Sequence, residues 1–183
     1  DMIQSRRNFL RSAGLVAAAG ALTACTVTTS GKTTTLTLNT AKVKAYGQAG
    51  INAVTTILSI TAVSTAMGAP AVAAIEAAGG ALSVSLSAFA SQTNGTLTVS
   101  YDNTDAKTRI DTLLVDLNNA AVALRAGLVA AQQTVTSSVV TTAITTFNAL
   151  LTVIDAFEGM LGISLTSVTD TQEATALSTL AVK

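Results

Sequence analysis

The stretch DAKTRIDTLLVDLNNAAVALRAGLVAA, residues 105–131, carries the clearest periodic pattern in the chain. Its apolar residues recur three and four positions apart, which places them on one side of an α-helix. These residues are Ile110, Leu113, Leu114, Leu117, Ala121, Leu124 and Leu128. The segment before them, 102–105, offers residues that cap a helix and acids that suit its positive end. The pattern predicts a long amphipathic helix that packs against other helices.

Three further stretches show helical spacing of their apolar residues. The first covers residues 41–67 and the second covers 71–91, with a glycine and a proline between them that end one helix and begin the next. The third covers 137–161, and either Ser137 or Ser138 can cap its start. Each stretch is long enough for roughly 30 Å of helix. Together with 105–131 they predict an all-α fold, a four-helix bundle of two helical hairpins.

Short alternating segments accompany these helices. Residues 35–38 read TLTL and residues 96–99 read TLTV, and each segment precedes a pair of expected helices. The two segments suggest a weak repeat, in which the short β-strands would pair at one end of the bundle. The tail begins with another strand-like segment, 163–166, and a short helix is expected over 171–180.

The composition restricts both the partners and the surface of the protein. Lysine plus arginine number 10 and aspartate plus glutamate number 10, so the formal net charge is zero and there is no basic footprint for nucleic acid. Charged residues make up 11% of the chain and aromatic residues 3%, whereas charged residues are about 25% of typical soluble domains. The surface must therefore consist largely of Ser, Thr, Asn and Gln. Low charge also weakens the repulsion between copies, which favours self-association.

The residues that most often carry catalysis are scarce. The chain has no histidine and one cysteine, Cys25, so the commonest general base is missing and thiolate metal sites are excluded. The sequence also lacks a phosphate-binding glycine loop, a nucleophile elbow and a dinucleotide fingerprint. We therefore expect no catalytic, cofactor-binding or metal-binding residues and no enzyme activity.

Carboxylates are the remaining candidates for chemistry. Asp102 and Asp105 could offer oxygen ligands to calcium, but the regular calcium-loop pattern is absent and a capping role is expected. Asp155 and Glu158 stand three apart on one helical face and could form an acid/base pair, although a solvated face is the expectation. Glu76 is also expected to be exposed. Convergence of the first four in one cleft would favour an enzyme instead.

Residues 5–25, SRRNFLRSAGLVAAAGALTAC, have the three parts of an export signal: a basic start, an apolar middle and a small-residue processing site. The export motif is formed by Ser5, Arg6, Arg7, Phe9 and Leu10. It resembles the twin-arginine (Tat) motif S-R-R-x-F-L-K, with Arg11 in place of the usual lysine. The apolar middle is shorter than the roughly 20 residues of a permanent membrane span. Residues 22–25, LTAC, resemble the lipobox of bacterial lipoproteins.

The resemblance implies export by the Tat pathway and lipidation of Cys25, which would anchor the protein to a membrane of the bacterial cell envelope. Thr26 follows the cysteine where an aspartate would favour the inner membrane, so the outer membrane or the cell surface is expected. The predicted organisation is a signal peptide over 1–24, a flexible Thr/Ser-rich tether over 25–34 and a helical-bundle domain over 35–183. The resemblance supplies no cofactor.

These features favour a non-catalytic, lipid-anchored protein that acts through protein contacts, as a homo-oligomer or with a partner in the envelope or on the surface. One alternative is a binding module for a small apolar ligand, which a pocket lined by Leu82, Leu86 and Leu117 would support. Another is a membrane-inserting or pore-type oligomer, because residues 45–75 and 126–154, 31 and 29 residues long, carry no charge. Their many Ser, Thr and Gln residues favour a soluble bundle over insertion.

Overall fold

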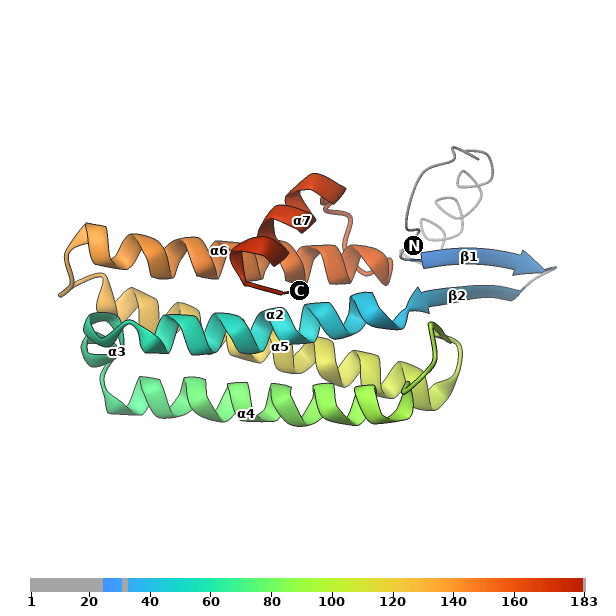
Figure 1. Ribbon diagram of the computed structural model, residues 1–183, viewed down its shortest axis with the longest axis horizontal. Coiled ribbons are helices and arrows are strands. Elements are labelled where there is room, and N and C mark those ends of the chain that lie inside the picture. Colours follow the sequence, from blue (N-terminus) through green and yellow to red (C-terminus); the bar gives the residue numbers. More distant parts are fainter. Residues whose placement is uncertain (1–24, 31–32, 183) are drawn as a thin grey trace, which may run out of the picture.

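The computed structural model describes residues 25–30 and 33–182, and it is mostly helical with a small antiparallel sheet (Figure 1). The strands are β1 (Cys25–Ser30), β2 (Thr33–Asn39) and β3 (Thr98–Ser100). The helices are α2 (Thr40–Ser59), α3 (Thr61–Met67), α4 (Ala69–Gln92), α5 (Thr104–Ala131), α6 (Ser137–Met160) and α7 (Asp170–Thr179). The prediction of a helical fold with short strands is confirmed.

The long helices α2, α4, α5 and α6 lie side by side along the long axis of the molecule (Figure 1). Helix α4 packs against α5 and α2, and α6 packs against the same two helices from the other side. Helix α7 lies across the outside of α6 and α2. The sheet lies at one end of the long axis, beside the start of α2.

The core follows the apolar stripe of α5. All seven residues predicted to form this stripe are buried, and four of them are completely inaccessible: Ile110, Leu113, Leu117 and Leu124. Asn103 caps the helix, because its Oδ1 accepts hydrogen bonds from the backbone N–H groups of Asp105 and Ala106. The local pattern and the tertiary packing therefore agree along the whole of α5.

The prediction of one continuous helix over 41–67 is wrong. Ile60 has an extended backbone, with φ −79° and ψ 92°, and α2 and α3 meet there at 89°. The preceding turn is rich in β-branched and hydroxyl residues, and the Ser59 hydroxyl bonds to the carbonyl of Thr56. Such residues lower helix stability and compete for backbone hydrogen bonds. The bend turns Val63 and Met67 into the core.

The sheet has the order β1-β2-β3, and both pairs are antiparallel. Leu38 of the TLTL segment lies opposite Val99 of the TLTV segment, so the predicted pairing is confirmed for the ends of the two segments, whereas residues 96–97 precede β3. Residues 25–30, expected to belong to a flexible tether, instead form β1, with Cys25 opposite Leu38. Thr and Val are good strand formers, and the hairpin supplies a partner strand that composition alone does not reveal.

Two expectations about the later part of the chain differ from the structure. Residues 163–166 form no strand, and the backbone N–H groups of Ile163 and Ser164 donate instead to the Glu158 carbonyl near the end of α6. Thr136, not Ser137 or Ser138, is the N-cap of α6, and its side chain makes no capping hydrogen bond. The expected C-terminal helix is confirmed as α7, which begins with a capping box between Thr169 and Gln172.

Candidate functional site

The carboxylates singled out in the sequence do not form a common site. Asp102 and Asp105 are exposed at the start of α5, where Asn103 provides the cap. Glu158 on α6 accepts a hydrogen bond from Asn118 Nδ2 at 3.4 Å. Within residues 25–30 and 33–182, none of the three aspartates considered, including Asp155, shares a hydrogen bond with Glu158. In the same residues no group of three or more Cys, Asp or Glu side chains is placed to hold a metal ion.

One polar cluster lies where β3 meets α5. The Tyr101 hydroxyl donates to Asp111 Oδ1 at 2.5 Å, and Lys107 Nζ lies 2.5 Å from Asp111 Oδ2. Lys107 also stands 4.6 Å from the centre of the Tyr101 ring. Partial burial and the hydrogen bond to Asp111 raise the pKa of Tyr101, and the Asp111 and Tyr101 contacts raise the pKa of Lys107. Neither Tyr101 nor Lys107 is suited to act as a base near neutral pH. The role of the cluster is to stabilise the turn between β3 and α5.

A second polar cluster, under α7, was not predicted. Tyr46 on α2 is 1% exposed and donates a hydrogen bond to Glu173 on α7, which is 8% exposed. Lys42 forms an ion pair with the same carboxylate. Burial and the Glu173 carboxylate raise the pKa of the Tyr46 hydroxyl well above its usual range. No local pattern in the sequence signals this contact, because its partners lie far apart in the chain.

The pocket that would have supported the alternative of an apolar-ligand binding module, lined by Leu82, Leu86 and Leu117, is filled by protein atoms. A Cβ atom at Gly50 would lie 2.5 Å from Leu82 Cδ2 and 3.3 Å from Leu117 Cδ1, and one at Gly47 would lie 2.7 Å from Leu86 Cδ1. The three leucines therefore occupy the space beside α2 that Gly47 and Gly50, which lack side chains, leave open. This close packing of α2 on α4 and α5 gives an apolar ligand no room at that position.

A shallow hollow of about 400 Å³ opens between α4 and α5. The Ser85 hydroxyl donates a hydrogen bond to the Asp116 carboxylate beside it. The hollow is lined by Val84, Ser85, Ala88, Asp105, Thr108, Arg109 and Thr112. Its walls mix small apolar and hydroxyl groups, which is typical of a contact surface more than of a reaction centre.

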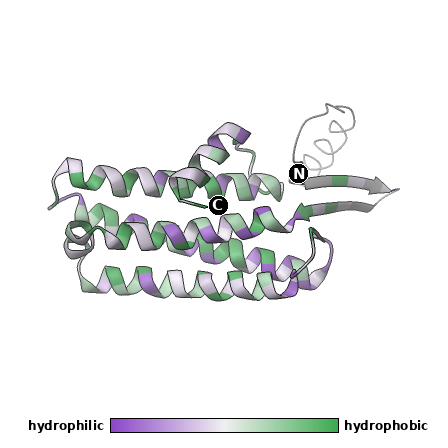
Figure 2. Cartoon of the chain, viewed as in Figure 1, coloured by the Kyte–Doolittle hydropathy of each residue, from purple (hydrophilic) through white to green (hydrophobic). Residues whose placement is uncertain are grey.

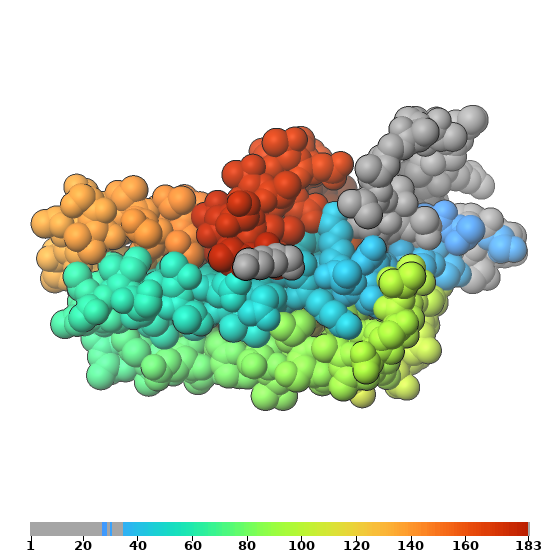
Figure 3. Space-filling view, in the orientation of Figure 1, coloured from blue at the N-terminus to red at the C-terminus, as the bar shows by residue number. Residues whose placement is uncertain are grey.

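The most unusual surface belongs to α4. Among the described residues, the three helices α4, α5 and α6 are long and apolar enough to cross a membrane by length and composition, and the bent pair of α2 and α3 would be a fourth. In the most apolar 18-residue stretch of α5 and of α6, 44% of the residues are buried, but in that of α4 only 22% are. Figure 2 shows α4 in green and white with few purple positions, and Figure 3 shows it along one border of the molecule. Helix α4 therefore exposes apolar surface that the rest of the described chain does not cover.

Small residues make up this outer face of α4. Its exposed members over 73–88 are Ala73, Ala74, Ala77, Gly80, Ala81 and Val84, together with the hydroxyl residues Ser83 and Ser87 and the single charge of Glu76. Val84 is 71% exposed. By contrast, the exposed residues of α6 are almost all Ser, Thr and Asn. We call the exposed side of α4 over residues 73–88 the α4 face.

Comparisons with known proteins add no assignment, since no family model, curated protein or solved structure matches the chain.

Proposed function

We propose that this chain is a non-catalytic, lipid-anchored protein of the bacterial cell envelope that acts through contacts with other proteins, copies of itself included. In this proposal the Tat-type signal exports the protein, Cys25 carries the lipid, and the protein resides at the outer membrane or the cell surface. The four long helices form a four-helix bundle of two hairpins, α2 with α4 and α5 with α6, and the outer surface of the bundle makes the contacts.

The observation that carries this proposal is the exposure of the α4 face. A helix that is apolar enough to be a membrane span, but has only 22% of that stretch buried, leaves apolar surface in contact with water. Burial of such surface contributes about 25 cal/mol per Å², so covering it is favourable. Large uncovered apolar patches mark sites of interaction with proteins or membranes.

A membrane-inserted oligomer is the second candidate, and the three helices of suitable length and composition support it. The outer sides of α2 and α6 weigh against insertion of the whole bundle. Gln48, Thr55 and Thr56 are exposed on α2, and Thr141 and Thr145 are exposed on α6. A helix that faces lipid needs an apolar surface all round, whereas here exposed apolar residues lie on α4 and α5 and the outer sides of α2 and α6 are polar. Protein contact at the α4 face is therefore the better-supported function.

The arrangement of polar groups supports the non-catalytic part of the proposal. The two polar clusters and the Ser85–Asp116 contact each join two elements of the fold. The hydrogen-bonding groups of these side chains are engaged in these contacts. None of these side chains is therefore left as an activated nucleophile or as a free acid/base pair.

The first experiment is to purify the full chain from the bacterial envelope in mild detergent and to combine intact mass spectrometry with light scattering. The expected result is a chain that begins at a lipidated Cys25 and an assembly at least twice as heavy as the protomer. An unlipidated monomer would overturn both the anchor and the self-assembly.

The contribution of the α4 face is tested with Ala81→Glu, which places a charge at the centre of that face. Thr145→Glu places the same charge on the polar side of α6 and is the matched control. We expect Ala81→Glu to reduce the mass of the assembly and Thr145→Glu to leave it unchanged. Equal masses for wild type and Ala81→Glu would show that the α4 face makes no functional contact.

A further inference from the structure

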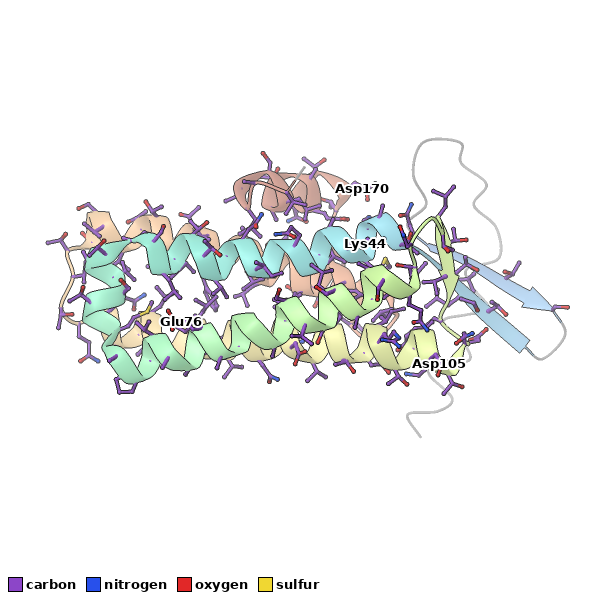
Figure 4. All side chains as sticks on the ribbon, turned by 60° about the horizontal axis from the view of Figure 1, so that its bottom comes forward. Lys44, Glu76, Asp105 and Asp170 are labelled. Atoms are coloured by element: carbon purple, nitrogen blue, oxygen red, sulfur yellow. The ribbon has the colours of Figure 1, made fainter. Side chains whose placement is uncertain are left out.

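Two charged residues flank the α4 face on its α2 side. Glu76 lies three residues before Gly79, which contacts Val54 of α2, and Lys44 lies three residues before Gly47, which contacts Leu86 of α4. Residues three apart on a helix lie near the same side of it, so both charges lie beside the contact between α2 and α4. Figure 4 shows them toward opposite ends of this side of the molecule.

Neither charge has a partner within the described chain. The ion pairs of residues 25–30 and 33–182 are Lys42 with Glu173 and Lys107 with Asp111, and neither Lys44 nor Glu76 makes a hydrogen bond through its side chain there. Glu76 is exposed and Lys44 is half-buried. Glu76 is therefore available to pair with a base of another chain, and Lys44 with an acid of another chain.

The contacts between α2 and α4 fix the height of Lys44 along α4. Gly47 meets Leu86 and Gly50 meets Leu82, so the two helices run antiparallel. In antiparallel helices, a step toward the start of α2 is level with a step toward the end of α4. Lys44, three residues before Gly47, is therefore level with the residue three positions after Leu86. Lys44 therefore lies at the level of Phe89, about 20 Å from Glu76 along the helix axis.

We infer that the α4 face binds a second copy of this chain, with the two α4 helices antiparallel and Glu76 of each copy paired with Lys44 of the other. A two-fold axis across α4 between Leu82 and Ser83 brings residue 76 of one copy level with residue 89 of the other. It therefore brings Glu76 of each copy level with Lys44 of the other. The two contacts are equivalent and lie on opposite sides of the axis. This inference rests on the proposed function, since it names the partner of the same face.

The same axis brings small residues together. Ala77 comes level with Ala88 of the second copy, and Ala81 comes level with Val84. Small side chains let two helices approach to about 8 Å, and a two-fold contact uses the same patch on both copies. The steric and the electrostatic fit therefore occur at one register.

The size of the patch suits a small dimer interface. The α4 face covers residues 73–88, which correspond to about 24 Å of helix. Together with the flank of α2 the patch is roughly 20 Å wide, because packed helices are 8–10 Å apart. It offers on the order of 500 Å² per copy, at the low end of specific interfaces, whose standard size is roughly 800 Å² per copy. The two ion pairs set the orientation more than the affinity.

The test uses the full processed chain in mild detergent, with dimerisation measured by sedimentation at a series of concentrations. Glu76→Lys and Lys44→Glu each place like charges opposite each other twice, so each variant should weaken its own dimer at least about tenfold. Asp102→Lys changes an exposed acid outside the patch and should leave the dimer unchanged. Circular dichroism confirms that all variants are folded.

The decisive experiment mixes the Glu76→Lys and Lys44→Glu chains. Every cross-copy contact in their heterodimer joins opposite charges, so the mixture should dimerise within about threefold of wild type although neither variant does so alone. No chain in the mixture carries both changes, so restored dimerisation cannot come from compensation within one chain. No heterodimer in the mixture, or no effect of either single change, would overturn the second-copy contact. In that case sensitivity of the assembly to Ala81→Glu leaves the proposed function standing, with a different protein or a bilayer on the face, and insensitivity overturns both.

Discussion

The hydroxyl of Tyr46 on α2 donates a hydrogen bond of 2.8 Å to Oε1 of Glu173 on α7, although 127 residues separate the two in the chain. Lys42 Nζ lies 2.9 Å from the other oxygen of the same carboxylate. The Tyr46 ring also lies 5.2 Å, centre to centre, from Phe157 of α6. Both carboxylate oxygens are therefore bonded to α2, and this contact holds the short α7 against the long helices.

Replacing Glu173 by Ala should destabilise the fold by about 2–4 kcal/mol, because it leaves the buried Tyr46 hydroxyl without a partner and Lys42 without its ion pair. Chemical denaturation followed by circular dichroism measures the change. Glu173→Gln keeps an acceptor for Tyr46 and should lose less. Glu76→Ala removes an exposed acid and should stay within about 0.5 kcal/mol of wild type, under conditions where the protein is monomeric. Equal losses for Glu173→Ala and Glu76→Ala would contradict a structural role of the buried carboxylate.

Stability should fall at alkaline pH because of Tyr46. Burial and Glu173 raise the pKa of Tyr46 in the folded chain, whereas in the unfolded chain it titrates near the usual value of about 10. The contribution is fully present below pH 10 and is lost above it, as the unfolded chain releases a proton that the folded chain retains. The loss should approach about 1.4 kcal/mol per pH unit.

The control for this pH dependence is Tyr46→Phe, measured by urea denaturation from pH 8 to pH 12. The raised pKa values of Tyr101 and Lys107 act in the same direction and are present in both proteins. The difference between wild type and Tyr46→Phe therefore isolates Tyr46. Parallel curves for the two proteins above pH 10 would refute the assignment.

Adding a single methyl group at Gly50 should destabilise the fold by about 1–3 kcal/mol. The new Cβ would lie 2.5 Å from Leu82 Cδ2, so the leucine must move in a closely packed region. At Gly159 the nearest atom to a new Cβ is the Thr166 carbonyl oxygen, at an ordinary 3.5 Å. Gly159→Ala should therefore be neutral or slightly stabilising, because alanine favours the helix. Thermal unfolding of both variants provides the comparison, and a harmless Gly50→Ala would mean that α2 and α4 are not in close contact.

Asn103→Ala should lower stability by about 1 kcal/mol, because it removes the acceptor for two backbone N–H groups at the start of α5. Asp102→Ala changes the neighbouring residue, which makes no capping bond, and should have little effect. Denaturation midpoints distinguish the two. A larger loss for Asp102→Ala than for Asn103→Ala would contradict the assignment of Asn103 as the cap.

The helices were largely predictable because their apolar residues repeat over several turns. The stripe from Ile110 to Leu128 identifies α5, and every residue of it is buried. The pairing of the TLTL and TLTV segments was also predictable, since both alternate and both precede helices. In each case the local pattern and the tertiary contact demand the same conformation.

The remaining features depend on contacts that no local pattern records. The bend at Ile60 occurs without glycine or proline, so nothing in the helical spacing of 41–67 announces it. The sequence of β1 is rich in Thr and Ser, which is typical of a flexible linker. Only its pairing with β2 makes it a strand. Glu173 reads as a solvent-facing acid in a short helix, and only the fold brings Tyr46 and Lys42 to it. The α4 face was missed as a surface because small apolar residues read as core.

The position of the sheet decides what an antiparallel pair of chains would do. Cys25 is opposite Leu38 at the start of α2, at one end of the long axis (Figure 1). A two-fold axis across α4 sends the two cysteines to opposite ends, roughly 40 Å apart on the helical rise of 1.5 Å per residue. Lipids on both then require the pair either to lie flat along one bilayer or to hold two facing bilayers at a set separation. In the second arrangement the pair would act as a spacer, and vesicles carrying the lipidated protein would cluster at a uniform gap; in the first the vesicles would stay dispersed.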